Sequence, residues 1–211
     1  MDWILRRVFY CLVLWPVALL VLGLNLRHRE RLPRRGPAIV AANHNSHLDT
    51  LVLLSLFPLS VIDRVRPVAA ADYFLRNRAL AWFSTHILNI LPLARDGVAR
   101  GEDPLAGSAA ALARGEILVV FPEGSRGDPE VLARFKGGVA RLKERVPQAP
   151  VVPVFLHGLG KALPKGEIVL VPFFVDIFVG EAVAWTGNRA DFTAALEAAV
   201  RQLAAEYGRP D

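Results

Sequence analysis

The stretch AIVAANHNSHLD, residues 38–49, places a short apolar run directly before a polar segment rich in histidine and asparagine. Ala38 to Ala42 is typical of a buried strand, and Leu48 to Phe57 has the composition of a helix. A strand that passes through a loop into a helix is the repeating unit of α/β folds. The stretch therefore predicts an α/β domain with polar side chains where one strand ends.

The same alternation continues along the chain. Further strands are predicted at residues 67–70, 87–93, 117–121, 151–156, 168–171 and 173–179, and helices at 73–83, 104–114, 137–145 and from Asn188 onward. Two of the last three strands follow each other without a helix between them, which favours a mixed sheet over a purely parallel one. We therefore predict an α/β fold with a mixed β-sheet flanked by helices.

The N-terminal segment has a different composition. Val8 to Leu26 contains one polar side chain, Asn25, and as a straight helix would extend about 28 Å, close to the thickness of a bilayer core. No small-residue cleavage site follows it, so we predict an uncleaved, membrane-associated helical segment. Pro16 lies near its middle, which leaves two arrangements open: one span, or two shorter helices within one leaflet.

The net charge of +5 is concentrated just after this segment, where Arg27 to Gly36 contains five arginines and one glutamate. A basic run beside an apolar segment is typical of contact with anionic lipid headgroups, and it favours membrane lipids over nucleic acid as partners. If the segment spans, the run places the rest of the chain on the cytoplasmic face of the inner (plasma) membrane. We expect a membrane-anchoring part, residues 1–35, and a catalytic domain, residues 36–211.

His44 and Asp49 are the first candidate catalytic pair. They are five positions apart and would not share a helix face, but they can meet if His44 stays on the loop and Asp49 lies in the first helical turn. Ser46 and Asp49 have the spacing of a capping box, which would fix that geometry. A histidine oriented by a carboxylate can remove a proton from a bound hydroxyl group. Capping alone would also explain Ser46 and Asp49, with His44 incidental.

A second polar segment, FPEGSR at residues 121–126, follows the predicted strand at 117–121. Ligands of open α/β sheets bind where strands end. Gly124 would allow a close backbone approach, and Arg126 could hold a phosphate through two hydrogen bonds. Lys136 precedes a predicted helix, and Arg95 ends another predicted strand. Three cations in such positions predict a phosphate-binding site.

These segments resemble the glycerophospholipid acyltransferase family, of the 1-acyl-sn-glycerol-3-phosphate (lysophosphatidic acid) acyltransferase type. Asn43 to Asp49 fits its NHx4D motif, Phe121 to Arg126 its FPEG(S/T)R motif, Phe135 to Gly137 the FK.G that follows, and Val152 to Val154 its VP(V/I) strand. The order and approximate spacing agree from about residue 36 to 180. Before Arg95 the chain lacks the glycine that is usual in the family.

The resemblance implies a transferase of phospholipid biosynthesis and lipid metabolism. It implies acyl transfer from acyl-CoA or acyl-carrier protein to a hydroxyl of a lysophospholipid acceptor, most simply 1-acyl-glycerol-3-phosphate, with no cofactor and no metal. His44 and Asp49 would be catalytic. The expected substrate-binding residues are Arg95, Glu123, Gly124, Ser125, Arg126 and Lys136.

Three alternatives stay open. The acceptor could be another lysolipid. The chain could be a metal-dependent hydrolase that uses His44, His47 and Asp49, with His157 at the end of a predicted strand completing the site. It could also be an inactive lipid-binding module of the membrane. The single cysteine, Cys11, argues against a disulfide framework or a cysteine-based metal cluster within one chain.

Overall fold

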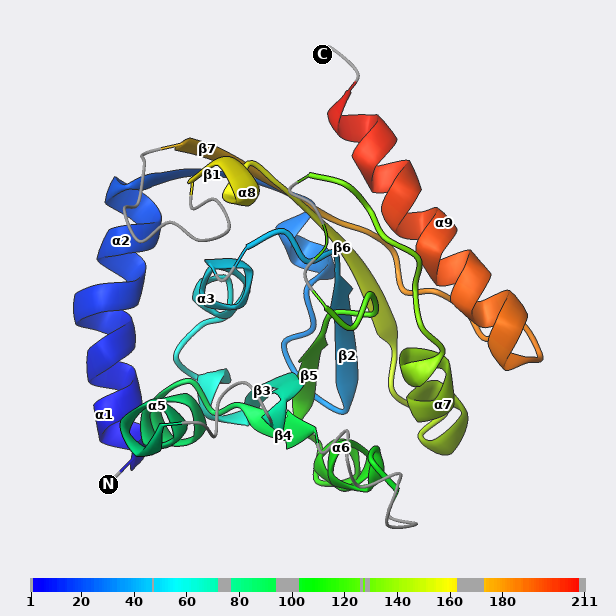
Figure 1. Ribbon diagram of the computed structural model, residues 1–211, viewed down its shortest axis with the longest axis horizontal. Coiled ribbons are helices and arrows are strands. Elements are labelled where there is room, and N and C mark those ends of the chain that lie inside the picture. The colour runs from blue at the N-terminus through cyan, green and yellow to red at the C-terminus, as the bar shows by residue number, and fades with distance from the viewer. Residues whose placement is uncertain are drawn as a thin grey trace.

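The computed structural model describes residues 2–46, 48–71, 77–93, 103–125, 127, 130–162 and 173–208. Within these residues one sheet has the strand order β1-β7-β6-β2-β5-β3-β4 (Figure 1). The strands are β1 (Leu22–Arg27), β2 (Ala38–Ala42), β3 (Val65–Ala70), β4 (Leu91–Leu93), β5 (Ile117–Val120), β6 (Val151–His157) and β7 (Phe173–Val179).

The strand directions confirm the predicted mixed sheet. All neighbouring strands are parallel except β6 and β7, which are antiparallel. Every residue of β2 is buried, because helices cover both faces of the sheet at its centre. A strand covered on both faces is apolar throughout, and this explains the uninterrupted run that begins the deciding stretch.

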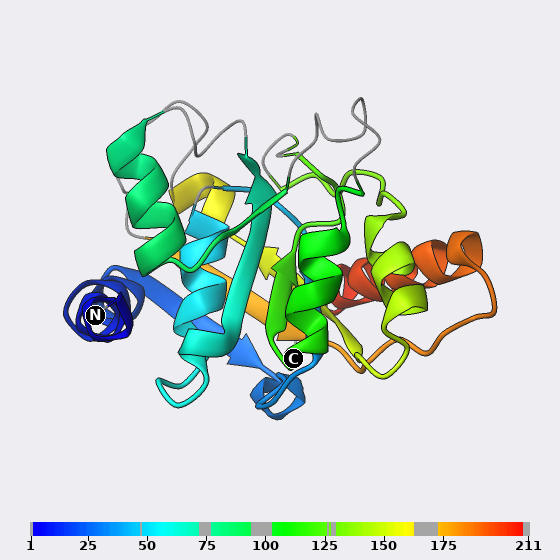
Figure 2. The same ribbon diagram turned by 90° about the horizontal axis from the view of Figure 1, so that it is seen from below.

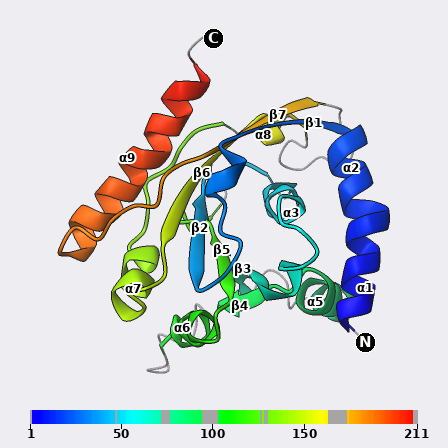
Figure 3. The ribbon, with the colours of Figure 1, turned by 180° about the vertical axis from the view of Figure 1, so that it is seen from behind.

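Helices pack on both faces of the sheet (Figures 1 and 3). The described helices are α1 (Asp2–Phe9), α2 (Trp15–Leu20), α3 (Leu48–Ser55), α5 (Arg78–Trp82), α6 (Ala106–Ala113), α7 (Gly138–Arg145), α8 (Leu159–Ala162) and α9 (Arg189–Tyr207). One core cluster joins Tyr10 and Leu14, between α1 and α2, to α3 and the strands, and a second joins α6, α7 and α9 to the opposite face. The two clusters hold the strand ends in fixed positions.

The helix predicted from Val8 to Leu26 is wrong beyond Leu20. Leu22–Arg27 instead forms β1, which pairs in parallel with β7 at the edge of the sheet. An apolar run alone does not distinguish a helix from a strand, and here the partner strand decides. The division at residue 35 stays a prediction, although β1, which precedes it, shares the sheet of the predicted catalytic part.

The helix that does form is not split at Pro16. The chain is helical from Asp2 to Leu20, with a wider π-helical turn at Tyr10–Leu14 between α1 and α2. Pro16 follows this wider turn directly, so the N–H group that it lacks falls where the regular α-helical hydrogen bonding is already interrupted. The helix is long and apolar enough to cross a membrane by length and composition.

The strand predicted at 87–93 is also largely wrong. Only Leu91–Leu93 is extended, and Phe83–Ile87 continues from α5 as a π-helical turn. Asn89 interrupts the segment with a left-handed backbone, φ 59°, and its side chain donates to the carbonyl oxygens of Asp63 and Val65. The strand predicted at 168–171 and the start of the helix predicted at Tyr73 lie outside the described residues.

Candidate active site

The two polar segments meet at one edge of the sheet. Because β2 and β5 are parallel neighbours, the loop after Ala42 and the turn after Val120 leave the sheet on the same side (Figure 2). The carboxyl end of β6 lies beside that of β2. Three strand ends therefore surround the predicted catalytic loop.

His44 and Asp49 form the contact that their spacing allows. His44 Nδ1 lies 2.8 Å from Asp49 Oδ2, and the same oxygen accepts hydrogen bonds from the backbone N–H groups of Asn45 at 2.6 Å and Ser46 at 2.8 Å. The bond from the Ser46 N–H is one half of the predicted capping box. Asp49 is therefore fixed both by the helix start and by the histidine.

Burial and hydrogen bonding act on Asp49 in opposite directions. The carboxyl group is fully buried, which raises its pKa, while the bonds from His44, Ser46 and Asn45 favour the charged form. The His44 ring stacks on Phe121, with 4.1 Å between the ring centroids, and the side chain stays 18% exposed. With Nδ1 facing Asp49, Nε2 is the ring nitrogen left for a substrate.

Glu123 connects the FPEGSR turn to the histidine loop. Its side chain is buried, and Oε1 accepts a hydrogen bond of 3.2 Å from the backbone N–H of His44. Burial, together with the nearby Asp49, raises the pKa of Glu123 to about 7 against the opposing effect of that hydrogen bond. The predicted contact with the acceptor stays a prediction, whereas the observed contact supports the loop.

The remaining predicted residues are placed in part. Gly124 has φ +75°, and a Cβ there would lie 2.8 Å from Lys136 Nζ, so the lysine side chain lies over the turn. The Lys136 N–H donates to Pro122 O at 2.8 Å, and Ser125 is exposed. Arg95 and Arg126 lie outside the described residues. Of the three cations predicted to bind a phosphate, the structure therefore places Lys136 beside the turn.

Two asparagines that sequence reasoning passed over hold the histidine loop to β6. The Asn43 side chain accepts from Leu156 N–H at 2.7 Å and donates to Leu156 O at 2.9 Å. Asn45 donates to the same oxygen at 2.9 Å. Both asparagines are buried. The signal was available in the sequence, since polar residues directly after a fully buried strand must find partners.

A second histidine–carboxylate pair lies beside the first and was also missed. His157 Nδ1 lies 2.9 Å from Glu130 Oε2, and Glu130 Oε1 accepts from the N–H groups of Gly158 and Gly160, each at 3.1 Å. Glu130 has a left-handed backbone, φ 61°. His157 thus faces Glu130 rather than His44. Among the described residues, which exclude His47, no group of three or more ligating side chains could hold a metal ion.

The family model described as Acyltransferase matches residues 23–157, from β1 to the end of β6. The chain belongs to the acyltransferase family. The match begins inside β1, so the first strand of the sheet is part of the family domain.

Curated relatives agree with this membership. The chain is 30% identical over 145 residues to the chloroplastic 1-acyl-sn-glycerol-3-phosphate acyltransferase LPAT1 of Arabidopsis thaliana. The aligned region covers 68% of this chain and 38% of that protein. It is 29% identical over 222 residues to the lyso-ornithine lipid O-acyltransferase of Rhizobium meliloti, covering 89% of this chain and 72% of that protein. It thus spans less than half the length of the chloroplastic relative.

A solved structure has the same fold. The 1-acyl-sn-glycerophosphate acyltransferase PlsC from Thermotoga maritima superposes with a TM-score of 0.71 at 21% sequence identity, covering 95% of this chain and 82% of that one. The superposition confirms the fold class, including an N-terminal apolar helix joined to a mixed seven-stranded sheet.

Proposed function

We propose that this protein transfers a fatty acyl group from an acyl thioester, acyl-CoA or acyl-carrier protein, to a hydroxyl of a lysophospholipid. The observation that carries the proposal is the 2.8 Å contact between His44 Nδ1 and the buried Asp49 carboxylate, beside the FPEGSR turn. The family supports acyl transfer, and the named relatives support a lipid acceptor.

The geometry suits direct transfer without an acyl-enzyme. His44 Nε2 takes the proton from the acceptor hydroxyl while Asp49 stabilises the imidazolium. The hydroxyl oxygen attacks the thioester carbonyl, and collapse of the tetrahedral species breaks the carbon–sulfur bond. The departing thiolate then takes the proton from His44, so the enzyme returns to its starting state without a metal or cofactor.

We favour 1-acyl-glycerol-3-phosphate as the acceptor. A phosphate headgroup matches Lys136 beside the Gly124 turn, and we assign Arg95 and Arg126 to the same phosphate. A second candidate is a lysolipid without a glycerol phosphate. The Rhizobium meliloti relative, named for lyso-ornithine lipid, matches 89% of this chain, a larger share than the chloroplastic relative does.

The test is an acyl-transfer assay on the protein purified in detergent. Acyl-CoA or acyl-carrier protein is offered with a panel of lysolipids, thiol release is followed with a thiol reagent, and products are identified by mass spectrometry. The wild type should release thiol only with an acceptor, and His44→Ala should abolish this release. His86→Ala, the same change outside the site, should not. Acceptor-independent release would indicate a thioesterase instead, and release retained by His44→Ala would remove the histidine from the mechanism.

We further propose that the N-terminal helix lies in the membrane interface rather than crossing the bilayer. One face of the helix is fixed to the domain: Arg6 is buried and donates to the carbonyl oxygens of His86 and Ile87, and Trp15 Nε1 donates to Ser55 O. The opposite face is apolar and open, with Leu19 73% and Leu20 84% exposed. A helix held to the domain near both ends is poorly placed to span.

Two measurements test this attachment. Leu19→Glu with Leu20→Glu should abolish flotation with anionic vesicles, whereas Ala198→Glu with Gln202→Glu, which adds the same charge on α9, should not. For orientation, Asp2→Cys in a Cys11→Ser background is exposed to an impermeant maleimide after binding to sealed vesicles. Labelling supports an interfacial helix, and protection of Asp2→Cys would show that the N-terminus has crossed.

A further inference from the structure

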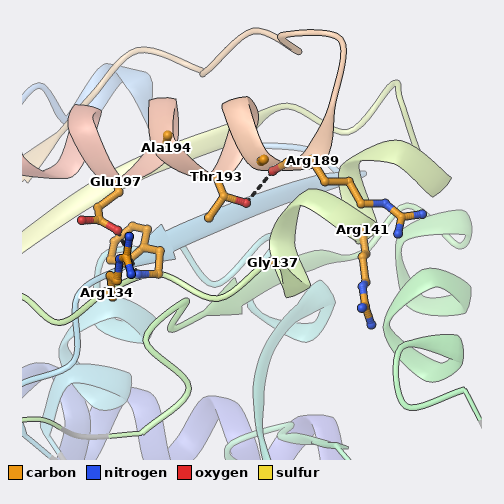
Figure 4. A pocket seen from close by; sticks show the side chains of 9 residues that line it. Arg134, Gly137, Arg141, Arg189, Thr193, Ala194 and Glu197 are labelled. Carbon is orange, nitrogen blue, oxygen red and sulfur yellow. Dashed lines mark hydrogen bonds between the residues drawn. The ribbon is translucent and has the colours of Figure 1, made fainter.

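A pocket of about 530 Å³ lies between α7 and the first half of α9 (Figure 4). Its volume is in the range of small-molecule and cofactor sites. The lining residues come from the segment before α7, from α7 and from α9: Arg134, Phe135, Gly137, Arg141, Arg189, Ala190, Thr193, Ala194 and Glu197. None of them belongs to the histidine–aspartate pair, so the pocket is a separate feature of the opposite face of the sheet.

The pocket is lined by three arginines and one glutamate. The negative charge of Glu197 is already compensated, because its carboxylate lies 2.9 Å from Arg201 and accepts a hydrogen bond from the Phe135 N–H at 3.0 Å. Arg189 pairs with Glu144. Arg134 and Arg141 form no ion pair with any other residue in the described ranges. Two guanidinium groups are therefore left to bind an anion, and guanidinium geometry suits phosphate oxygens.

The space between these arginines is open. Figure 4 shows Arg134 beside Glu197 at one end of the pocket and Arg141 with Arg189 at the other. Between them lie small residues, including Gly137, Ala190 and Ala194. A Cβ added to Gly137 would meet no atom within 4 Å. The pocket thus has room for a group as bulky as a phosphate ester.

The segment Arg134–Gly137 joins this pocket to the candidate active site. The Phe135 N–H bonds to Glu197 on α9, whereas the N–H of the next residue, Lys136, bonds to Pro122 O in the FPEGSR turn. Lys136 Nζ lies over Gly124, and the neighbouring Glu123 contacts the His44 backbone. Phe135, which lines the pocket, is therefore adjacent in sequence to Lys136, which is hydrogen-bonded to the turn that supports the His44 loop.

We propose that this arginine pocket binds the phosphate of the acyl donor's 4′-phosphopantetheine arm. The inference rests on the proposed acyl-thioester function. In both acyl-CoA and acyl-carrier protein the thioester is at one end of that arm and a phosphate at the other. When the thioester lies at His44, the phosphate must lie away from the dyad. The arginine pocket is joined to the FPEGSR turn by the segment Arg134–Gly137 and carries the matching charge.

The first test compares two single substitutions on α9. Ala194→Glu places a carboxylate in the pocket, and Ala198→Glu makes the same change at an exposed position of the same helix outside it. Ala194→Glu should raise the KM for the acyl donor about tenfold, because a carboxylate that pairs with a lining arginine deprives the phosphate of one charge-assisted interaction, with kcat and the KM for the lysolipid unchanged. Ala198→Glu should match the wild type.

The second test removes the cations and varies the donor. Arg134→Ala with Arg141→Ala should raise the KM for acyl-CoA, and Arg64→Ala with Arg114→Ala, the same charge change elsewhere, should not. Acyl-pantetheine, which lacks the phosphate, should have the same KM in both double variants. A rise with acyl-CoA and acyl-carrier protein assigns the shared phosphate. A rise with only one of them names that donor as the source. No rise with either overturns the proposal.

A binding measurement separates this proposal from the proposed function. Titration calorimetry with CoA and with holo-acyl-carrier protein requires no turnover. Weaker binding to the Arg134→Ala, Arg141→Ala variant than to the wild type supports the pocket even if no acceptor is acylated. Equal binding overturns the pocket while leaving acyl transfer intact. A wild type that binds neither compound overturns the pocket as well.

Discussion

Two histidine–carboxylate pairs lie at adjacent strand ends, and they differ in what holds the carboxylate. Asp49 lies in the first turn of α3, fully buried, and one of its oxygens accepts from the histidine and two loop amides. Glu130 lies on a loop in a left-handed backbone; one oxygen faces His157, and the other binds the amides of Gly158 and Gly160. Asp49 orients a histidine, whereas Glu130 joins two loops.

The histidines differ in the same sense. His44 stacks on Phe121 from the FPEGSR turn, so its ring belongs to the candidate site. His157 packs against Tyr207 near the end of α9, with 4.1 Å between the ring centroids. A hydrogen-bonded histidine and carboxylate are therefore not sufficient evidence of catalysis. Whether such a histidine is catalytic depends on the groups around the part of its ring that does not face the carboxylate. Each pair can therefore serve as a control for the other.

The largest effect should separate the two carboxylates in an activity assay. Asp49→Asn keeps the size of the side chain but removes the charge that stabilises the imidazolium, and it should lower kcat by about 10²–10⁴-fold. Glu130→Gln should lower kcat by less than about tenfold, because its hydrogen bonds to the loop amides can persist. Steady-state acyl transfer with both substrates saturating measures this. Equal losses in the two variants would mean that both pairs take part in proton transfer.

The pairs also separate what the sequence could predict from what it could not. The contact between His44 and Asp49 follows from local spacing and the helix start, and it was predicted. The clamp made by Glu130 was not, because its partners Gly158 and Gly160 are 28 and 30 positions away. Asn43 reaches Leu156, 113 positions away, in the same manner. Local pattern predicts elements and motifs, whereas contacts between loops depend on the order of strands in the sheet.

The edge of the sheet shows the same limit. Leu22–Arg27 forms a strand because β7 is available beside it, and that partner is about 150 residues further along the chain. Within the apolar run from Val8 to Leu26, Gly23 lies close to the change from helix to strand at Val21, but an isolated glycine does not by itself end a helix. The central strand β2 was predicted correctly because its apolar run is short and is bounded by Gly36 and Pro37 on one side and by Asn43 on the other.

A smaller effect should appear in the pH dependence of stability, through Glu123. Its pKa is about 7 in the folded protein against an ordinary 4.5. Between these values the unfolded chain has lost a proton that the folded chain keeps. The contribution of Glu123 to the free energy of unfolding therefore falls as pH rises, by at most about 1.4 kcal/mol per pH unit. It levels off above pH 7. Glu123→Gln lacks this loss, so its stability relative to the wild type should increase from pH 4.5 to 7.

Urea unfolding in detergent at several pH values measures this difference. Glu197→Gln is the matched control: the Phe135 N–H lowers the pKa of Glu197, so its ionisation is complete in both states across the upper part of this range. The control should differ from the wild type by a constant amount there. A constant difference for Glu123→Gln as well would mean that Glu123 is charged in the folded protein, and the His44 loop would then be held by a carboxylate at neutral pH.

The smallest effect isolates the backbone of Glu130 from its carboxylate. Glu130→Ala and Glu130→Gly both remove the clamp, but φ 61° costs an alanine about 1 kcal/mol more than a glycine. The glycine variant should therefore melt at the higher temperature. At Ala133, which is not among the residues with positive φ, substitution by glycine should lower the melting temperature instead. Opposite signs at the two positions would show that the rest of the loop keeps this backbone left-handed even without the contacts of Glu130 to His157, Gly158 and Gly160. Equal melting of Glu130→Ala and Glu130→Gly would mean that the loop relaxes once the carboxylate is gone, so that the clamp itself creates the left-handed turn.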